Sequence, residues 1–428
     1  MIKNILAFLT LQSTQAFIPN YSFQTYTRPN LRNTYFKKHI NNDNDEEIIT
    51  ILKQQELIKR DYTLAKPPDE HSLLPQNLKK GSRIIAFGDV HGDVEALRDF
   101  LIVAGILDPN SSNEHPVWNK ECKDTIVVQT GDILDRYHNE LECIRMLCKL
   151  SHQALQYDSS IICLLGNHEI KNCIGAFEYT TDQANAEFEG VFGEYLDRSY
   201  SSKWRVQYAN NQPTRWNVCE PGNGLLSQNV LSNMKVAIVV GKSLFVHAGV
   251  TKEHLLHYNN SIAQMNEDAN QWITSLHHDE NNHEGEFETI DHILASVQRR
   301  MNYAIDNLPY CVSGSVGSAS PIWMRDYSMP ANASPSSSKQ KMIEDALHQI
   351  GNGVERIVMG HTVQENINVA LKGRAFRIDV GASRGIKGGR VEVLEIIHNG
   401  EDEDCTIHVL GEGGRIPVQD RHVLDYDF

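Results

Sequence analysis

The sequence predicts an α/β fold in which two mixed β-sheets form a sandwich flanked by helices. From residue 83 onward, short apolar runs of strand length alternate with amphipathic helical segments, which is typical of layered α/β domains. Polar motifs follow these runs, as expected where ligands bind beyond the carboxyl ends of strands. The later runs 375–380, 391–397 and 406–410 have few helices between them, so we expect them to form a second, more antiparallel sheet.

The elements follow one another in a readable order. Apolar residues recur at helical spacing over 43–62, and Lys66-Pro67-Pro68 ends this helix and begins a linker. The run Arg83-Ile84-Ile85-Ala86-Phe87 predicts the first strand, and helices are predicted over 94–104 and 139–157. We divide the chain into an N-terminal segment over 1–42, a helix and linker over 43–80, and one large domain over 81–428.

Composition limits the possible classes of function. The chain has 428 residues, enough to bury a large core, and a formal net charge of -15 at pH 7. No basic stripe interrupts this acidic balance, so we expect no nucleic-acid binding. The eight cysteines include no Cys-x-x-Cys pair, and their spacing does not suggest a disulfide framework.

Five short polar segments occur in a fixed order, each just after an apolar run or within one. They are Gly88-Asp89-Val90-His91-Gly92, Gly131-Asp132-Ile133-Leu134-Asp135-Arg136, Gly166-Asn167-His168-Glu169, His247-Ala248-Gly249 and Gly360-His361-Thr362. Together they supply three aspartates, one asparagine and four histidines. This set can hold two adjacent divalent metal ions and leave one general acid. A two-metal site is the usual device for cleaving a phosphate ester with water.

The carboxylate of Asp132 is the best candidate to bridge two metal ions, because its two oxygens can each bind one cation. We therefore expect two divalent ions that share this residue. The first ion takes Asp89, His91 and Asp132, and the second takes Asp132, Asn167, His247 and His361. Mixed nitrogen and oxygen ligands without thiolate favour manganese, with iron or zinc as alternatives.

Three residues beside these ligands fit the remaining chemistry. His168 adjoins Asn167 and has no metal to bind in this scheme, and Asp135 lies three residues beyond Asp132. A histidine oriented by a carboxylate has a raised pKa and can protonate a leaving oxygen. Arg136 has a planar guanidinium suited to two phosphate oxygens. We expect His168 to be the general acid, Asp135 to orient it and Arg136 to contact phosphate.

Each motif alone has a simpler interpretation. A Gly-Asp pair is most often a turn, and a histidine after an apolar run is most often a core or surface residue. The segment Asn167-His168-Glu169 alone would indicate the N-terminus of a helix. Five such segments after five strand-like runs favour one common site over coincidence.

This series of motifs resembles the calcineurin-like metallophosphoesterases, within the phosphoprotein phosphatase superfamily. It departs from the main eukaryotic serine/threonine phosphatases, which have Arg where this chain has Leu165 and Gly where it has Tyr137. The segments 320–325 and 377–385 resemble the Pro-x-Trp-x-Arg and Ile-Asp-x-Gly-x-Ser segments of bacterial-type members. In its motifs the chain is most similar to the Shewanella-like, bacterial-type protein phosphatases.

The resemblance implies a metallophosphoesterase-type sandwich and makes 81–428 the catalytic domain, with insertions at about 171–234 and 251–340. It makes Arg325 a second phosphate contact. The simpler alternative is a surface arginine that stacks on Trp323 or Tyr327. Both insertions lie beside the expected site, so we expect them to wall the substrate cleft, although their aromatic residues more often form a local core.

The expected reaction is hydrolysis of a phosphomonoester by metal-activated hydroxide. The resemblance implies a phosphoprotein substrate that carries phosphoserine, phosphothreonine or phosphotyrosine, which the motifs do not separate. The alternatives are a symmetrical dinucleoside tetraphosphate hydrolase, since that bacterial-type relative uses similar motifs, and a non-catalytic scaffold that retains the fold. Intact ligands together with His168 and Arg136 argue against the scaffold. The sequence indicates no oligomeric state.

The N-terminus resembles a targeting presequence over residues 1–42. Its apolar stretch, Ile5-Leu6-Ala7-Phe8-Leu9, is too short for a permanent membrane span and fits the core of a signal peptide. No acidic residue appears before Asp43, while basic residues accumulate. The pair Ala16-Phe17 resembles the junction of bipartite plastid presequences in algae. We expect a plastid location, with the secretory pathway or another organelle as the alternative.

Overall fold

The computed structural model describes residues 56–197, 213–275, 290–314, 319–401 and 403–423. The chain divides into two compact units, Met1–Arg60 and Asp61–Phe428. Of the first unit, residues 56–60 are described, and they are helical. The expected presequence over 1–42 and most of the helix expected over 43–62 lie outside the described residues. All the described strands and the candidate site belong to the second unit.

The first sheet is built around three parallel strands that the sequence predicts as apolar runs. Its strand order is β11-β10-β9-β1-β2-β3, and β2 is parallel to both β1 and β3. The strands are β1 (Arg83–Phe87), β2 (Thr125–Gln129), β3 (Ser160–Cys163), β9 (Glu392–Ile397), β10 (Thr406–Gly411) and β11 (Gly414–Pro417). Nearly every residue of β1, β2 and β3 is buried, which is typical of parallel strands covered on both faces.

The second sheet has the strand order β4-β5-β6-β8-β7. Its strands are β4 (Ala237–Val240), β5 (Ser243–Val246), β6 (Arg356–Met359), β7 (Asn368–Ala370) and β8 (Ala375–Arg377). The middle strands β5, β6 and β8 are parallel, and β4 and β7 close the two edges in the antiparallel sense. Both sheets are therefore mixed, as predicted.

The grouping of the C-terminal strands differs from the prediction. Only β8 joins the second sheet, whereas β9 and β10 extend the first, where β9 pairs antiparallel with β1. The four residues from Val393 to Ile396 are all buried, so β9 needs cover on both faces and a neighbour along each edge. A place between β1 and β10 supplies all of these.

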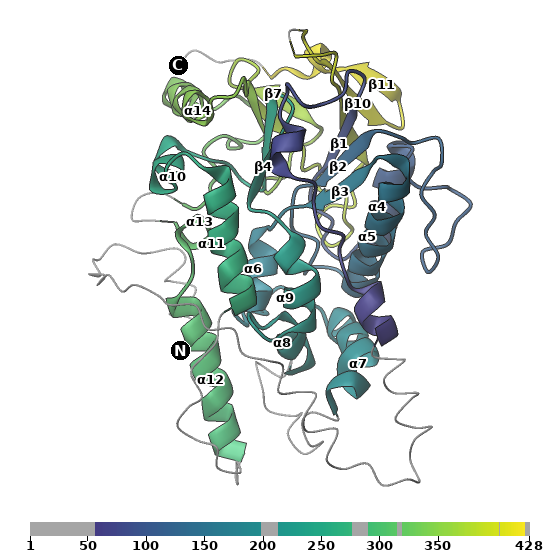
Figure 1. Ribbon diagram of the computed structural model, residues 1–428, viewed down its shortest axis with the longest axis vertical. Coiled ribbons are helices and arrows are strands. Elements are labelled where there is room, and N and C mark those ends of the chain that lie inside the picture. Colours follow the sequence, from purple (N-terminus) through teal and green to yellow (C-terminus); the bar gives the residue numbers. More distant parts are fainter. Residues whose placement is uncertain (1–55, 198–212, 276–289, 315–318, 402, 424–428) are drawn as a thin grey trace. The chain divides into compact units, whose positions relative to one another are not determined.

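Helices flank both sheets (Figure 1). The helices are α4 (Val94–Val103), α5 (Glu140–Ala154), α6 (Asn167–Cys173), α7 (Asp182–Asp197), α8 (Pro213–Cys219), α9 (Leu225–Asn229), α10 (Lys252–His257), α11 (Ile262–Ser275), α12 (Ile290–Asp306), α13 (Tyr310–Ser313) and α14 (Ser337–Ile350). Short 3₁₀ helices are η1 (Glu70–Leu73), η2 (Leu155–Tyr157), η5 (Leu231–Asn233) and η6 (Val418–Arg421).

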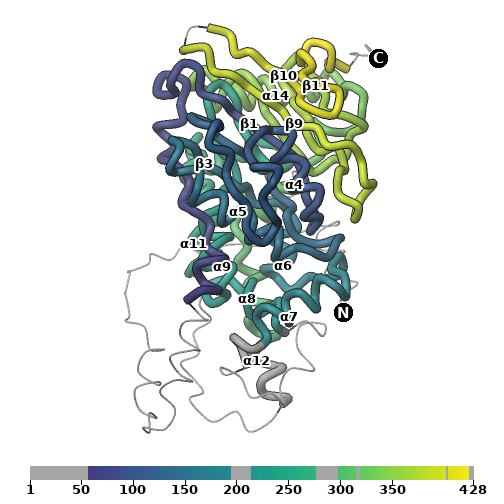
Figure 2. Tube along the Cα trace, turned by 90° about the vertical axis from the view of Figure 1, so that its right-hand side faces the viewer, coloured from purple at the N-terminus to yellow at the C-terminus, as the bar shows by residue number. Residues whose placement is uncertain are grey.

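The helices α4 and α5 connect the parallel strands of the first sheet and pack beside it (Figure 2). They match the helices predicted over 94–104 and 139–157. On the second sheet, α10 and α14 contact each other, and α14 buries Ile343 and Leu347 in one core with residues of β5 and β6. The predicted architecture of two mixed sheets flanked by helices is confirmed.

The described parts of both expected insertions contain helices. The helices α7, α8 and α9 belong to the first insertion, and α10 to α13 belong to the second. Phe188, Phe192 and Trp216 of the first insertion are buried, so these aromatic rings form a local core, as the sequence favours. Trp204 lies outside the described residues.

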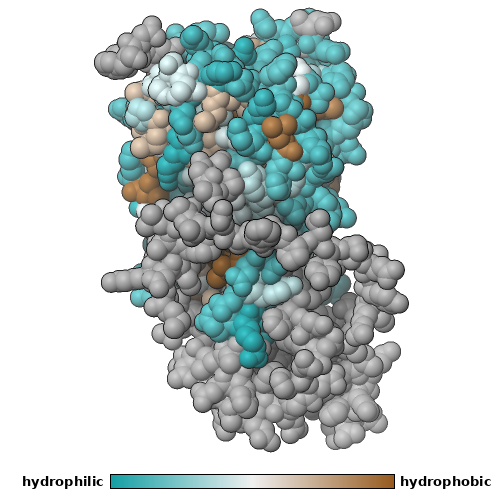
Figure 3. Space-filling view, turned by 90° about the vertical axis from the view of Figure 1, so that its left-hand side faces the viewer, coloured by the Kyte–Doolittle hydropathy of each residue, from teal (hydrophilic) through white to brown (hydrophobic). Residues whose placement is uncertain are grey.

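The cysteine side chains of the described chain are reduced and mostly buried. All eight cysteines are free, and every one except Cys405 is buried, so they behave as small apolar core residues. The face drawn in Figure 3 is mostly hydrophilic over the described residues, with small separate hydrophobic areas. Within the described ranges, no helix combines the length and apolar character needed to cross a membrane.

Candidate metal centre and active site

The candidate ligands converge because each follows a strand whose end lies at the same edge of its sheet. The strands and their ligands are β1 with Asp89 and His91, β2 with Asp132, β3 with Asn167, β5 with His247, and β6 with His361. Parallel strands bring their carboxyl ends to one edge, where ligands bind. The loops of the two sheets also touch, because the His361 N–H donates to Oδ1 of Asp89 at 3.2 Å.

The backbone of these loops is adapted to close packing. His91, Asp132 and His361 adopt φ angles of 47°, 58° and 65°, a costly conformation for non-glycine residues that is concentrated at functional sites. A Cβ on Gly166 would lie 2.2 Å from Oδ1 of Asp132, and a Cβ on Gly131 would lie 2.6 Å from Gly166 N. Glycine at these positions lets two ligand-bearing loops meet.

One group of possible metal ligands consists of Asp132, His247 and His361, whose ligand atoms lie within 4.8 Å of one another. Nε2 of His247 lies 3.4 Å from Oδ2 of Asp132, 3.1 Å from Oδ1 of Asn167 and 3.1 Å from Nδ1 of His361. All four side chains are buried. The four residues that the sequence assigns to the second ion are thus brought together.

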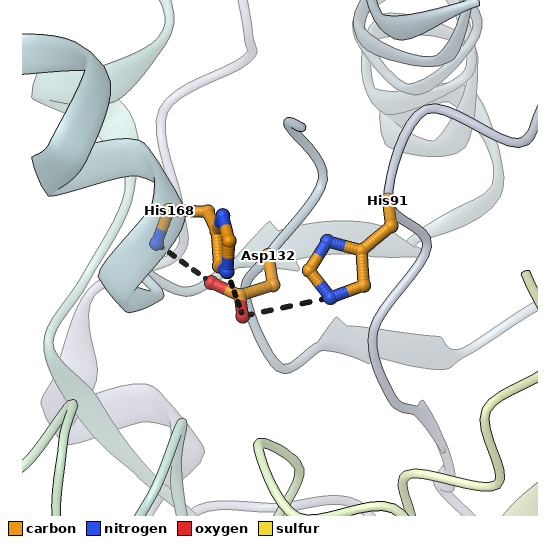
Figure 4. A group of neighbouring side chains, drawn as sticks. All are labelled: His91, Asp132 and His168. Atoms are coloured by element: carbon orange, nitrogen blue, oxygen red, sulfur yellow. Dashed lines mark hydrogen bonds and ion pairs between the residues drawn. The ribbon is translucent and has the colours of Figure 1, made fainter. Parts of the chain in front are cut away.

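A second group surrounds the same carboxylate from the other side. Nε2 of His91 lies 3.8 Å from Oδ2 of Asp132 and 3.9 Å from Oδ2 of Asp89. Figure 4 shows the Asp132 carboxylate between the rings of His91 and His168. Asp132 is therefore the residue common to both groups, as the sequence predicts for a bridging ligand.

Hydrogen bonds orient three of the histidine rings as ligands. Each ring places one nitrogen against a backbone carbonyl, which fixes the proton on that nitrogen and leaves the other as an electron-pair donor. The three contacts are His91 Nδ1 with Leu134 O at 3.0 Å, His247 Nδ1 with Thr130 O at 2.7 Å, and His361 Nε2 with Trp323 O at 3.2 Å. The remaining nitrogens face the Asp132 region, so the donor set fits metal ions.

The electrostatics of the cluster also fit bound cations. Burial, with Asp379 nearby, holds the pKa of Asp89 well above its usual value. Burial lowers the pKa of His91 to about 4. Burial opposes protonation of His247, but the Asp132 carboxylate outweighs it and raises the pKa of His247 to about 10. Divalent cations would relieve the repulsion among these buried carboxylates, and the neutral ring of His91 could bind one of them.

His168 is paired with a carboxylate, as predicted. Its Nδ1 lies 2.7 Å from Oδ2 of Asp135, and both side chains are buried. Burial disfavours the imidazolium, but Asp132 and Asp135 outweigh it and hold the pKa of His168 above its usual value. A buried imidazolium held by a carboxylate is suited to donate a proton.

The same histidine also lies near the first metal group, which sequence reasoning missed. Nε2 of His168 lies 4.0 Å from Oδ2 of Asp132, and His91, Asp132 and His168 meet the distance condition for a shared ion. The guanidinium Nη2 of Arg136, however, lies 3.4 Å from the same nitrogen. A fixed positive charge there opposes a metal cation on Nε2.

The two predicted phosphate contacts reach the site from different sides. Arg136 lies with its guanidinium 4.6 Å from the centre of the Tyr179 ring, and its Nε is buried with no hydrogen-bond partner among the described residues. Arg325 is exposed and donates from Nη1 to His361 O at 3.1 Å and to Thr362 Oγ1 at 2.8 Å. Arg136 therefore lies beside His168, and Arg325 beside the His361 loop.

Residues of the first insertion also line this region, without a local signal in the sequence. Tyr179 accepts the Arg136 N–H at 2.8 Å and packs its ring 5.2 Å from the ring of His168. Nζ of Lys171 lies 4.8 Å from the Tyr179 ring and 5.4 Å from the Trp323 ring, and pairs with Glu178. These contacts depend on tertiary structure and follow no periodic pattern.

Comparison with known proteins agrees with this geometry. The chain matches the calcineurin-like phosphoesterase family over residues 82–365. It is 30% identical over 353 residues to Shewanella-like protein phosphatase 2 of Arabidopsis thaliana, which covers 77% of this chain and 79% of that protein. It is 34% identical over 126 residues to Shewanella-like protein phosphatase 1 of Plasmodium berghei, or 29% of this chain and 32% of that protein.

Solved structures show the same fold. The cold-active protein-tyrosine phosphatase of a psychrophilic Shewanella species superposes with a TM-score of 0.52 at 18% identity, over 84% of this chain and 90% of that chain. Another structure of a cold-active protein tyrosine phosphatase gives a TM-score of 0.51 at 17% identity, over 83% and 88%. Motif order, fold and the family match together show that the chain belongs to the calcineurin-like phosphoesterase family, with Shewanella-like protein phosphatases among its relatives.

Proposed function

We propose that this protein is a metal-dependent phosphoprotein phosphatase. The observation that carries the proposal is the position of Asp132, whose Oδ2 lies 3.4 Å from Nε2 of His247 and 3.8 Å from Nε2 of His91, beside the His168–Asp135 pair. This combination of shared carboxylate, flanking metal ligands and proton donor is suited to the hydrolysis of a phosphate ester. The family match supports the phosphoester, and the names of the relatives support a protein substrate.

The buried donor set would hold two divalent ions. The residues proposed are Asp89, His91 and Asp132 for one ion, and Asp132, Asn167, His247 and His361 for the other. Such ions, when bound, polarise phosphoryl oxygens and lower the pKa of water, so that hydroxide is available near neutral pH. Nitrogen and oxygen donors without thiolate favour manganese, with iron or zinc next.

The remaining residues act directly on the phosphate. Arg136 and Arg325 hold phosphoryl oxygens, since a guanidinium forms strong paired hydrogen bonds with phosphate. His168 donates the proton on Nε2 to the oxygen of the leaving group. Asp135 accepts the proton on Nδ1, which keeps the ring in one orientation and stabilises its charged form. We assign His168 to this role and not to a metal because the carboxylate of Asp135, 2.7 Å from Nδ1, stabilises the protonated ring against the nearby charge of Arg136.

The proposed substrate is a phosphoprotein with phosphoserine, phosphothreonine or phosphotyrosine. One relative is named a protein phosphatase, and a structural neighbour is named a protein tyrosine phosphatase. The proposal therefore includes both the alkyl phosphates of serine and threonine and the aryl phosphate of tyrosine. A dinucleoside tetraphosphate hydrolase would use the same ligands on a phosphoanhydride. A substrate panel that contains phosphoserine, phosphothreonine and phosphotyrosine peptides and a dinucleoside tetraphosphate separates these activities.

The variant His168→Asn tests the proposed chemistry. With manganese present, wild type should hydrolyse a phosphoserine peptide, and the variant should lose about 10²-fold or more in turnover, the usual scale for a general acid. An activated aryl phosphate should be affected less, because its leaving group needs less protonation. Bound metal should stay unchanged. The matched control is His115→Asn at an exposed position; equal turnover in both variants would contradict the assignment.

A further inference from the structure

A buried arginine lies next to Asp135 of the His168–Asp135 pair. Arg215 lies on α8, and its side chain is fully buried. It forms two parallel hydrogen bonds with Glu140, from Nη1 to Oε2 and from Nη2 to Oε1, each at 2.8 Å. Two buried charges stabilise a fold only when their geometry is good and their other polar atoms are also satisfied. The further hydrogen bonds of the Arg215 guanidinium, beyond those to Glu140, therefore show what else this side chain holds in place.

One branch of this network runs to the general acid. Nη1 of Arg215 also donates to Oδ1 of Asn172 at 2.7 Å. Nδ2 of Asn172 donates to Oδ1 of Asp135 at 3.0 Å and to the backbone oxygen of His168 at 2.9 Å. Oδ2 of Asp135 then meets Nδ1 of His168 at 2.7 Å. Asn172 thus accepts with its oxygen and donates with its nitrogen, which is the only orientation that satisfies both neighbours.

The guanidinium itself is held in one place. Nε of Arg215 donates to Oδ1 of Asn185 at 2.9 Å, and the guanidinium lies 4.0 Å from the centre of the Phe188 ring. Both contacts come from α7, in the first insertion. A guanidinium held in this way also fixes the side chain of Asn172, because any shift of Arg215 would break a hydrogen bond to Glu140, Asn172 or Asn185.

We propose that Arg215 is a positioning residue for the phosphatase reaction, which orients Asp135, and through it the His168 ring, by way of Asn172. This inference rests on the proposed function. If Arg215 served only to neutralise the charge of Glu140, the two hydrogen bonds between their side chains would be sufficient. The further branch through Asn172 ends on the carboxylate that orients the acid, and Nη1 lies only 3.7 Å from Oδ1 of Asp135. The first insertion would then contribute to the chemistry, because α8 supports the proton donor through Asn172.

The test measures two substrates, and each substitution is made both in the wild-type protein and in the His168→Asn variant. Arg215→Lys keeps the positive charge but loses the fork that reaches Glu140 and Asn172 together. It should lower kcat on a phosphoserine peptide by up to about 100-fold, the scale of a misplaced catalytic group. It should lower kcat on p-nitrophenyl phosphate much less and leave KM and bound manganese close to wild type. Asn172→Ala, which leaves the Arg215–Glu140 pair intact, should reproduce the same split between substrates.

The same substitution in the His168→Asn background isolates the positioning role. There Arg215→Lys should have no further effect on kcat, since residues that act through one another are not additive. The control is Arg377→Lys, because Arg377 is also fully buried and donates to Oδ1 of Asn368 at 2.6 Å, but on the second sheet. Any loss from this control should be equal for both substrates and persist in the His168→Asn background.

The outcomes separate this role from the proposed function. Equal losses on both substrates, or a full further loss in the His168→Asn background, would overturn the positioning role while the phosphatase assignment stands. Wild type that hydrolyses neither ester would overturn the phosphatase assignment and this role with it. Far-UV circular dichroism of each variant gives the folded fraction, and the substrate ratio is independent of that fraction.

Discussion

The carboxylate of Glu169 accepts the backbone N–H of Asp132 at 2.8 Å. It also accepts the backbone N–H of Gly166 at 2.8 Å, of Ile133 at 2.8 Å and of Leu134 at 3.2 Å. Glu169 is fully buried, so these four donors replace the water that its carboxylate loses on folding. One side chain thereby fixes both the loop that carries Asp132 and the start of α6.

Glu169→Gln should therefore lower the free energy of unfolding of the metal-free protein by about 1–3 kcal/mol. The amide NH2 of glutamine would replace one accepting oxygen and face backbone N–H groups that need an acceptor. Chemical denaturation measures the change, with Glu253→Gln at an exposed position on α10 as the control. If both variants unfold at the same denaturant concentration, the four bonds contribute little to stability.

Gly166→Ala should weaken metal binding about tenfold or more, a scale typical of disturbing the groups that orient metal ligands. The new Cβ would lie 2.2 Å from Oδ1 of Asp132, so the carboxylate or its loop has to move. Gly190→Ala in α7 is the matched control, because no atom lies within 4 Å of a Cβ there. Manganese affinity measured by calorimetry should fall only for the first variant; equal affinities would mean that the contact does not position Asp132.

The pH dependence of stability should include a contribution from Glu187. Burial raises the pKa of Glu187 from 4.5 to about 7, although its carboxylate accepts the N–H groups of Leu141 and Glu142 at the start of α5. The folded chain then binds a proton in a range where the unfolded chain has lost it. The free energy of unfolding should fall as pH rises from about 4.5 to 7, with an upper limit of about 1.4 kcal/mol per pKa unit.

Glu187→Gln removes this titration. The difference in unfolding free energy between wild type and Glu187→Gln should change across the range from pH 4.5 to 7, in the direction that favours wild type at the acidic end. Urea denaturation at a series of pH values gives both curves. A constant difference across this range would show that Glu187 ionises in the folded chain as it does in the unfolded chain.

We propose a plastid location on the basis of the N-terminal sequence, which lies outside the described residues. A fusion of residues 1–38 to a fluorescent protein should reach the plastid of an alga with a secondary plastid, and Phe17→Ala in the fusion should keep it outside. The reasons are the short apolar stretch, the Ala16-Phe17 pair and the basic tract without acidic residues. Diffuse cytosolic fluorescence of the unmodified fusion would overturn the location, and secretion into the medium would favour the secretory pathway.

The ligand cluster could be predicted because its signals are local in the sequence. Asp89, Asp132 and His247 each follow an apolar run, and a run of strand length implies a carboxyl end where ligands gather. The positions of Asp135 and His168 beside the ligands predict a pair, and Oδ2 of Asp135 lies 2.7 Å from Nδ1 of His168. In these cases the chemistry of a residue and its place after a strand were sufficient.

Long-range relationships could not be predicted in the same way. The sequence pattern assigns β9 and β10 to a second sheet, because apolar runs alone do not reveal that β9 pairs with β1. Arg215 and Tyr179 contact Asp135 or Arg136 only through the tertiary arrangement of the first insertion. A single arginine in a helix, or a single tyrosine in a turn between helices, carries no periodic signal of such a contact.

We propose that two metal ions sharing Asp132 make this protein a phosphatase. The most direct measurement is phosphate release from a phosphopeptide while metal-free protein is titrated with manganese and the bound metal is counted. We expect no activity without metal, saturation at about two ions per chain as in other two-metal enzymes, and loss of both metal and activity in Asp132→Asn. Full activity in the metal-free protein, or two tightly bound ions in an active Asp132→Asn variant, would contradict this proposal.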